Sequence, residues 1–245
     1  MKLKVIGYWG GFPGVNEATS GYLIESHNYR LLVDCGSAVL SKLQETIALD
    51  DLDSVILSHY HHDHVADIGP LQFAFHVTSF IKGTKKTLPI YGHRLDEEAF
   101  KSLTYKEATK GIEYNPNEAL KIGPFTIEFL QTIHPVPCFA MRISDDHSTI
   151  VYTADSSFKE EFIPFTKGAD LLIAESSFYA DQDGTNSGHM NSKDVAKIAA
   201  AAEVPQVILT HLPHFGEHEN LVKEASELYN GQVVLASTGY EWCTK

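Results

Sequence analysis

The stretch Ser58-His59-Tyr60-His61-His62-Asp63-His64 decides how this sequence is interpreted. It follows the apolar run Val55-Ile56-Leu57, which predicts a short buried strand, so the histidines lie on the loop at the carboxyl end of that strand. Side chains two residues apart on an extended segment point the same way, so His59, His61 and Asp63 can face one spot. Imidazole and carboxylate are ligands that zinc and similar divalent metals prefer. The stretch therefore predicts a metal-binding loop.

A solvated histidine-rich loop is the alternative interpretation of the same residues. It would have to place four ligand-type residues in the order H-x-H-x-D-H by accident, directly after a strand. His64 joins the set if the chain turns after Asp63, whereas His62 lies on the opposite phase from His61 and is expected to be a bystander. We therefore favour the metal-binding interpretation.

Length and composition indicate one large globular domain over residues 1–245. The chain has 43% hydrophobic residues, with 13 Phe and 11 Tyr, which fits a packed core rather than a disordered chain. The net charge is −13, because 32 acidic residues outnumber 19 basic ones. An acidic protein binds nucleic acid poorly without sequence recognition, since that affinity comes from Lys and Arg, so we expect no DNA partner.

The cysteines and the apolar runs bear on the compartment. Cys35, Cys138 and Cys243 are odd in number and widely spaced, which argues against a disulfide framework. The first residues lack the apolar segment of a signal peptide, and no apolar run approaches 18 residues. We expect a cytoplasmic protein that does not associate with a membrane.

The ordered motif of His59, His61, Asp63 and His64 resembles the signature of the metallo-β-lactamase-fold hydrolases. Strands alternating with helices, in two similar halves, indicate only an α/β fold. The resemblance implies more: a four-layer αβ/βα sandwich of the metallo-β-lactamase fold, two divalent metal ions, and three further ligands at strand ends. Those ligands would be a histidine, a bridging aspartate and a final histidine.

The sequence supplies a candidate for each of these ligands. His134 follows the predicted strand at 125–130, Asp155 follows the strand at 149–152, and His211 ends the apolar run 207–210. The resemblance then implies the following set: His59, His61 and His134 on the first metal, Asp63, His64 and His211 on the second, and Asp155 between them. Imidazole-rich sites favour zinc, although manganese or iron also fits a site with two carboxylates.

A second pattern bears on the type of reaction. Ala174-Glu175-Ser176-Ser177-Phe178 and the later Gly188-His189-Met190-Asn191 resemble two motifs of the RNase Z branch of this superfamily. The resemblance implies three catalytic residues: His189 as a general acid, Glu175 as the residue that orients it, and Asp63 of the metal loop. The alternative is a helix-capping loop that happens to contain a histidine. The pair favours an enzyme, a phosphodiesterase that cleaves a P–O bond with a hydroxide bridging the metals.

The sequence departs from the RNase Z pattern where that enzyme grips tRNA. About twenty residues separate His134 from Asp155, too few for the long arm, and no arginine stands in the segment 212–218. We expect a small or cyclic phosphodiester, or an RNA 3′ end, as substrate. A hydrolase of a lactone, thioester or β-lactam is the alternative, and a non-catalytic metal-binding protein is a third interpretation. RNase Z relatives are commonly homodimers, so the resemblance also implies a homodimer.

Several further expectations concern single residues. Asp34 either supports the metal loop through hydrogen bonds or is an ordinary turn residue. The Gly- and Pro-rich loop 10–16 either brings backbone N–H groups to an anion or is a flexible connection. Helical spacing predicts a helix over 37–49. The aromatic residues of the next helix, Phe73, Phe75 and Phe80, are expected in the core. His93 either lines the cleft or lies in a surface turn, and the surface turn is favoured.

Overall fold

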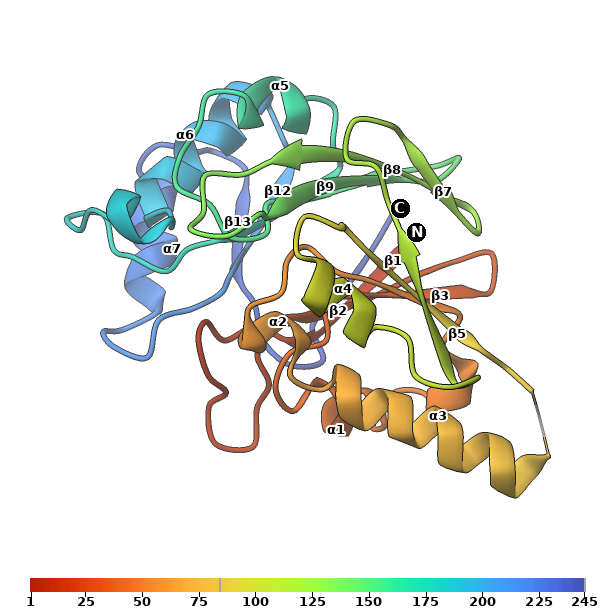
Figure 1. The fold of residues 1–245 in the computed structure, drawn as a ribbon. Coiled ribbons are helices and arrows are strands. Elements are labelled where there is room, and N and C mark those ends of the chain that lie inside the picture. Colours follow the sequence, from red (N-terminus) through yellow and green to blue (C-terminus); the bar gives the residue numbers. More distant parts are fainter. Residues whose placement is uncertain (84, 245) are drawn as a thin grey trace. The chain divides into compact units, whose positions relative to one another are not determined.

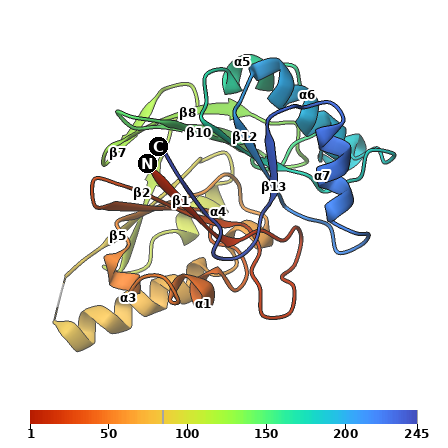
Figure 2. The ribbon, with the colours of Figure 1, turned by 180° about the vertical axis from the view of Figure 1, so that it is seen from behind.

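The computed structural model describes residues 1–83 and 85–244, which form two compact units. Unit 1 consists of Met1–Gly7, Gly11–Asn115 and Ser237–Cys243, and unit 2 of Tyr8–Gly10 and Pro116–Ala236 together with Thr244. Each unit contains one mixed sheet with helices (Figures 1 and 2). The α/β class is therefore confirmed, and a single domain over 1–245 stays a prediction.

Unit 1 contains a seven-stranded sheet in the order β14-β1-β2-β3-β4-β5-β6. Its strands are β1 (Lys2–Gly7), β2 (Gly21–Ser26), β3 (Tyr29–Val33), β4 (Ser54–Ile56), β5 (Leu88–Gly92), β6 (Thr109–Glu113) and β14 (Glu241–Cys243). Pairing is antiparallel from β14 to β3 and parallel from β3 to β6. The strands β3 and β4 thus end at the same edge of the sheet.

The helical segments of unit 1 are α1 (Val39–Leu43), η1 (Leu49–Asp51), α2 (His62–Val65), α3 (Ile68–Lys82) and α4 (Glu97–Ser102). Figure 1 shows α1 and α3 on the same side of this sheet. Val39 of α1 and Leu71 and Phe75 of α3 pack with the strand residues Leu32 and Val55 in one buried cluster. This apolar layer fixes the position of the loop that leaves β4.

Unit 2 contains the second seven-stranded sheet, in the order β13-β12-β11-β10-β9-β8-β7. Its elements are β7 (Leu120–Ile122), β8 (Phe125–Gln131), β9 (Phe139–Ser144), β10 (Thr149–Tyr152), α5 (Phe162–Thr166), β11 (Leu171–Glu175), η2 (Thr185–Ser187), α6 (Ser192–Ala202), β12 (Gln206–Thr210), α7 (Glu219–Ser226) and β13 (Gln232–Leu235). Helix α6 begins with a capping box, in which Asn191 and Asp194 each bond the other's backbone N–H. Figure 2 shows α5, α6 and α7 together beside this sheet.

Strand direction in unit 2 brings four connections to one edge of the sheet. Strands β8 and β10 run in the same direction because both are antiparallel to β9. Strands β11 and β12 are parallel to β10. The residues that follow β8, β10, β11 and β12 therefore emerge at one edge, and these connections contain His134, Asp155, Ser177 and His211.

Three of the expectations about single segments are wrong. The helix expected over 37–49 is only the five-residue α1, which starts after Ala38 in the left-handed region (φ 65°) and has no side-chain cap. Phe73 and Phe80 of α3 are 58% and 85% exposed, and only Phe75 is buried, because one face of the helix already fills the core. His93 is buried rather than in a surface turn, since Tyr60 packs against its ring at 4.6 Å.

Among the described residues, no helix combines the length and the apolar character needed to cross a bilayer. The longest helix, α3, has 15 residues.

Candidate metal centre

The loop that leaves β4 turns into helix α2 at His62 and thereby gathers its imidazoles. The ring centroids of His59 and His61 are 4.8 Å apart, and those of His59 and His64 are 4.1 Å apart. His59 and His64 are fully buried and Asp63 nearly so, whereas His62 is exposed. The turn after His61 therefore brings His64 back to His59, as a metal-binding loop requires.

Asp34, which follows β3, supports this loop through hydrogen bonds. Its Oδ2 atom accepts from Nδ1 of His64 and from Oγ of Ser58, both at 2.8 Å, and its Oδ1 atom accepts from the Ser58 backbone N–H at 2.8 Å. All three residues are completely buried. The supporting role of Asp34 is therefore confirmed, and it is not an ordinary turn residue.

The hydroxyl of Ser58 fixes the tautomer of His59. Its single proton is donated to Asp34, so its lone pair accepts from Nδ1 of His59, at 3.0 Å. A carboxylate only accepts, so His64 also donates its Nδ1–H. In both rings Nε2 therefore carries the lone pair, and a lone pair on a ring nitrogen is what a metal binds.

The Gly-rich loop contacts the carboxylate of the metal loop. The backbone N–H of Gly11, at a φ of 72°, donates to Oδ2 of Asp63 at 2.8 Å. The same carboxylate oxygen lies 3.6 Å from Nε2 of His64. Of the two interpretations of residues 10–16, the one that brings a backbone N–H to an anion is supported, and the anion is the Asp63 side chain.

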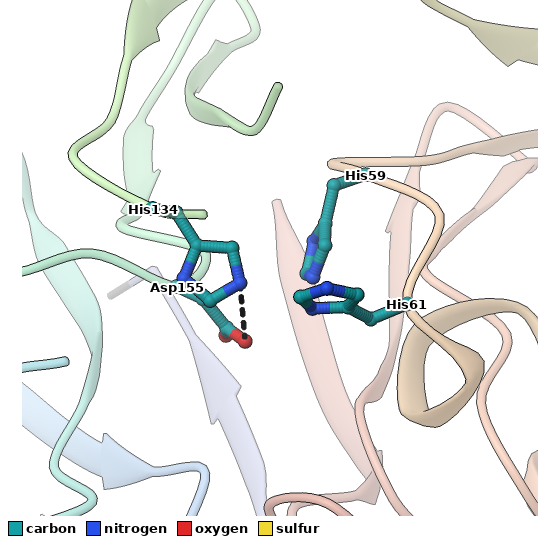
Figure 3. Close-up of side chains that lie close together, drawn as sticks. All are labelled: His59, His61, His134 and Asp155. Atoms are coloured by element: carbon teal, nitrogen blue, oxygen red, sulfur yellow. Dashed lines mark ion pairs between the residues drawn. The ribbon is translucent and has the colours of Figure 1, made fainter. Parts of the chain in front are cut away.

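A buried carboxylate of unit 2 faces two imidazoles. Oδ2 of Asp155 lies 3.9 Å from Nε2 of His134 and 3.3 Å from Nε2 of His211. Nδ1 of His134 donates to the carbonyl of Gly188 at 3.0 Å, so its Nε2 also carries the lone pair. Figure 3 shows His134 and Asp155 with this contact as a dashed line, and also draws His59 and His61 of the metal loop. One buried carboxylate oxygen therefore faces the Nε2 atoms of two histidines, and the bridging role of Asp155 stays a prediction.

The chain leaves three of the strands in a conformation that non-glycine residues rarely adopt. Asp34 after β3, Ala154 after β10 and His211 after β12 have φ values of 57°, 51° and 52°. Each costs about 1–2 kcal/mol relative to ordinary backbone, a strain that clusters at functional sites. The sharp turns therefore lie at or next to Asp34 in unit 1 and Asp155 and His211 in unit 2.

Glu175, at the end of β11, is completely buried and accepts five hydrogen bonds. Its Oε1 atom accepts from Nδ1 of His189 at 2.8 Å and from the backbone N–H groups of Met190 and Ser156 at 3.1 and 3.2 Å. Its Oε2 atom accepts from the backbone N–H and the hydroxyl of Ser177, at 3.1 and 2.9 Å. The bond from Nδ1 of His189 orients that ring on Glu175, and the acid–base role of the pair stays a prediction.

Ser177 links this pair to His211, a candidate metal ligand. Its hydroxyl donates to Glu175 and accepts from Nδ1 of His211 at 2.8 Å, so Nε2 of His211 points toward Asp155. The His189 ring lies near two candidate ligands, with its centroid 5.3 Å from that of His134 and 5.1 Å from that of His211. Sequence reasoning missed Ser177 and Ser58, although each stands beside a predicted site residue.

His214 and His218 anchor the loop that follows His211. Nε2 of His214 donates to the Gly10 carbonyl at 3.1 Å, and the His214 ring stacks on Trp9 at 4.5 Å. Nε2 of His218 donates to the Pro213 carbonyl at 2.6 Å. A Cβ atom at Gly10 would lie only 2.6 Å from Nδ1 of His211, so this backbone packs directly on the His211 ring.

Burial changes the acidity of two groups that border the metal loop. Burial, and then the charge of Asp96, raise the pKa of Tyr60, which stays protonated and donates to the His93 carbonyl at 2.6 Å. Burial, followed by the charges of Asp67 and Asp34, raises the pKa of the Cys35 thiol well above its usual value. The Tyr60 hydroxyl therefore ties the metal loop, between His59 and His61, to the backbone at His93. Cys35 is a buried thiol that stays protonated.

Comparisons with known proteins agree with this geometry. A family model described as "Beta-lactamase superfamily domain" matches residues 29–212, which is more than half of the chain. The chain therefore belongs to the β-lactamase superfamily, as a metallo-hydrolase of the metallo-β-lactamase fold with His and Asp clusters able to bind metal. It is similar to the "Probable metallo-hydrolase YhfI" of Bacillus subtilis, with 62% identity over 99% of both chains.

Solved structures and more distant relatives extend the comparison. The crystal structure of YhfI from Bacillus subtilis matches with a TM-score of 0.97 and 60% identity over 98% of each chain. A diphosphatase of the PhnP family matches with a TM-score of 0.79 and 18% identity, covering 100% of this chain and 98% of that one, which is a likeness of fold. The ribonuclease Z of Methanopyrus kandleri is 24% identical, over 98% of this chain and 96% of its own.

Proposed function

We propose that this metallo-hydrolase is a dinuclear phosphodiesterase that cleaves P–O bonds. The observation that carries the proposal is the Asp155 carboxylate, which faces Nε2 of both His134 and His211 within unit 2. The family relationship supports adding the metal loop of unit 1 to this set. In the proposed centre His59, His61 and His134 hold one ion, Asp63, His64 and His211 hold the other, and Asp155 is shared.

The donor set fits two divalent metal ions. His59 and His64 of the loop, and His134 and His211 of unit 2, use Nδ1 in hydrogen bonds and direct the Nε2 lone pair elsewhere. Imidazole nitrogens with two carboxylates favour zinc, and manganese or iron also fits. When bound, such ions lower the pKa of a water and offset the negative charge of a phosphodiester.

His189 and Glu175 supply the proton that the leaving oxygen needs. Glu175 accepts Nδ1–H of His189, which orients the ring and stabilises its cationic form, so that Nε2–H is the proton delivered. His189 is partly exposed (18% of its side chain), whereas Glu175 is completely buried. Substrate can therefore reach the histidine and not its orienting carboxylate.

The substrate class follows from charge and from what the chain lacks. With a net charge of −13 and no long insertion between His134 and Asp155, a small or cyclic phosphodiester, or an RNA 3′ end, suits the protein better than a whole tRNA. Relatives named ribonuclease Z and a fold neighbour named a diphosphatase support P–O chemistry. Three cysteines without a disulfide among the described residues support a cytoplasmic location.

The test is a comparison of substrates on protein loaded with zinc or manganese. We expect turnover of bis(p-nitrophenyl) phosphate or 2′,3′-cyclic AMP, with less turnover of a lactone, a thioester and a β-lactam. Metal analysis should give two ions per chain, and Asp155→Ala should bind fewer. Faster hydrolysis of the esters than of the phosphodiesters would contradict the proposal and favour the alternative class.

The role of His189 has its own test. A general acid matters when the leaving group is a poor one, and matters little for p-nitrophenolate. His189→Ala should therefore lower kcat about 100-fold or more on a substrate with an alkoxide leaving group, and much less on the nitrophenyl ester. His62→Ala, an exposed histidine of the metal loop, is the matched control. Equal losses on both substrates would argue that His189 is not the proton donor.

A further inference from the structure

Three aromatic rings form a column beside the loop that follows His211, and all three belong to unit 2. The ring centroids of Tyr8 and Trp9 are 5.4 Å apart at an interplanar angle of 28°, and those of Trp9 and His214 are 4.5 Å apart at 13°. Burial decreases along the column, because Tyr8 is buried, Trp9 is half-buried and His214 is exposed. We call Trp9 and His214 the Trp9 platform, whose exposed ring is that of His214.

One glycine joins this platform to the candidate metal ligand His211. The carbonyl of Gly10 accepts from Nε2 of His214 at 3.1 Å, and a Cβ atom on Gly10 would lie only 2.6 Å from Nδ1 of His211. The Gly10 N–H donates to the Leu212 carbonyl at 3.2 Å, which fixes this backbone beside the loop. Three residues of chain span at most about 11 Å, so the His214 backbone lies within that distance of His211. The platform is therefore next to a proposed ligand of the metal centre.

The chemistry of the platform suits a flat, uncharged ring. Histidine and tryptophan are among the side chains on which unstacked nucleobases stack in protein complexes. The segment 212–218 contains no Lys or Arg and includes the exposed Glu217, so it does not attract a phosphate group. Divalent metal ions in the proposed centre would attract that group instead. A ligand with an aromatic ring at one end and a phosphate at the other matches both parts.

We propose that the Trp9 platform binds the nucleobase of the substrate, so that this protein acts on nucleotide phosphodiesters in preference to phosphodiesters without a base. The inference rests on the proposed phosphodiesterase function and narrows its substrate class. The base stacks on the exposed ring of His214, which Trp9 supports from the other side. Stacking on one aromatic side chain is worth about 5–100-fold in affinity. Because stacking contacts the face of a base and not its edge, the platform accepts more than one base.

Two substitutions at His214 separate stacking on a base from anchoring of the loop. His214 anchors the loop through its hydrogen bond to the Gly10 carbonyl. His214→Gln keeps an N–H donor for that carbonyl and removes the ring, whereas His214→Phe keeps a ring and removes the donor. Phe215→Ala is the matched control, because Phe215 is an exposed aromatic residue of the same loop (47%) whose ring packs near Tyr179.

The experiment compares the binding of adenosine 5′-monophosphate and of ribose 5-phosphate, which has the same phosphate and no base. Isothermal titration calorimetry on zinc-loaded protein gives both dissociation constants. We expect the nucleotide to bind about 5–100-fold more tightly than the sugar phosphate in the unmodified protein and in Phe215→Ala, with most of this preference kept in His214→Phe. In His214→Gln the two compounds should bind equally.

A second measurement leaves His214 unchanged. The chain has two tryptophans, so Trp9 is the only one in Trp242→Phe. We expect adenosine 5′-monophosphate, and not ribose 5-phosphate, to change the fluorescence of Trp9 in this variant, since the base would stack on the ring that Trp9 supports. No change with the nucleotide, while calorimetry shows that it binds, would place the base elsewhere and overturn the proposal.

The remaining outcomes separate the platform from the reaction. Equal affinity for the two compounds in the unmodified protein would overturn the platform, and so would a preference for the nucleotide that His214→Gln keeps or that His214→Phe loses. A nucleotide preference that follows the expected pattern, without turnover of any phosphodiester, would support the platform and contradict the proposed reaction. Turnover of phosphodiesters without that preference would support the reaction and contradict the platform.

Discussion

The loop of unit 1 and the sheet edge of unit 2 hold their histidines in the same way. In unit 1 the buried Asp34 accepts directly from His64 and reaches His59 through the Ser58 hydroxyl. In unit 2 the buried Glu175 accepts directly from His189 and reaches His211 through the Ser177 hydroxyl. We call these the Asp34 network and the Glu175 network. In each, one carboxylate and one serine orient two imidazoles.

The two networks differ in the proposed roles of the two histidines that each one orients. Both histidines of the Asp34 network are proposed metal ligands. In the Glu175 network only His211 is, and His189, at 18% side-chain exposure, is available to substrate. The same arrangement of hydrogen bonds can thus orient a ligand or a proton donor. The difference lies in exposure and position along the sheet edge.

The largest expected effect is on the free energy of unfolding, and it tests whether Asp34 and Glu175 stabilise the fold equally. Asp34→Asn and Glu175→Gln each place an amide NH₂ where both oxygens now accept hydrogen bonds, so a donor meets a donor in the interior. We expect each to lower the free energy of unfolding by about 2–4 kcal/mol. Urea denaturation measures this. Only Asp34→Asn should also weaken metal retention at both loop histidines. A neutral result for either amide would show that its network is dispensable.

A smaller effect distinguishes the two serines. Ser58→Ala and Ser177→Ala remove the acceptor for Nδ1 of His59 and His211, and such supporting bonds are worth about 10–100-fold in metal affinity. Competition with a chromophoric chelator measures the affinity. Threonine at either position keeps the hydroxyl and should restore most of it. If alanine and threonine behave alike, the hydroxyl does not orient the ligand.

A still smaller effect concerns two buried cysteines, one near each network, because the rate at which each is labelled reports local opening of the structure. Cys35 adjoins Asp34, and Sγ of Cys138 donates to the Asp155 carbonyl at 3.5 Å. Both are buried, and a raised pKa keeps Cys35 protonated at neutral pH, so iodoacetamide should label exposed Cys243 first. Asp34→Asn should then accelerate labelling of Cys35 and not of Cys138, as peptide mass spectrometry would show. Equal acceleration of both would mean that the two networks open together.

The smallest expected effect concerns Glu241, an exposed carboxylate that belongs to neither network and therefore serves as a reference for the stability measurements. Lys4 and Lys2, both bonded to Glu241, lower the pKa of that carboxyl. A lowered folded-state pKa stabilises the protein above the unfolded value of about 4.3, and this stabilisation is lost as the pH falls through the lower folded value. Glu241→Gln should therefore cost under about 1 kcal/mol at pH 7, because these groups are exposed. The cost should be lost as the pH falls through the lowered pKa of the folded state, and it should shrink in high salt.

The comparison also explains what the sequence could predict. The candidate ligands of unit 1 stand within six residues, His59 to His64, so their spacing alone indicates a metal site. His134, Asp155 and His211 are far apart and became candidates only through resemblance, each at the end of an apolar strand. The sense of β8 relative to β10, which brings His134 to the same edge, depends on the intervening hairpin and was not readable from the sequence.

Other features were hidden because they depend on tertiary contacts. The roles of Ser58 and Ser177 follow from which atom receives the hydroxyl proton, and no residue pattern encodes that choice. The exposure of Phe73 and Phe80 was missed because apolar spacing gives the period of a helix and not which of two apolar faces meets the core. The short α1 resulted from a left-handed Ala38, a conformation that residue type alone does not predict.

The pairing of β14 with β1 has a consequence for how the chain folds as it is synthesised. Strand β14, residues 241–243, covers the edge of β1, residues 2–7. That edge therefore stays uncovered until the ribosome has synthesised the residues between the two strands. The strands of unit 2 lie within residues 120–235 and can pair earlier. An uncovered β1 edge in the nascent chain invites pairing with other chains. Slow translation or truncation near residue 240 should therefore favour aggregation through the first strand rather than the last.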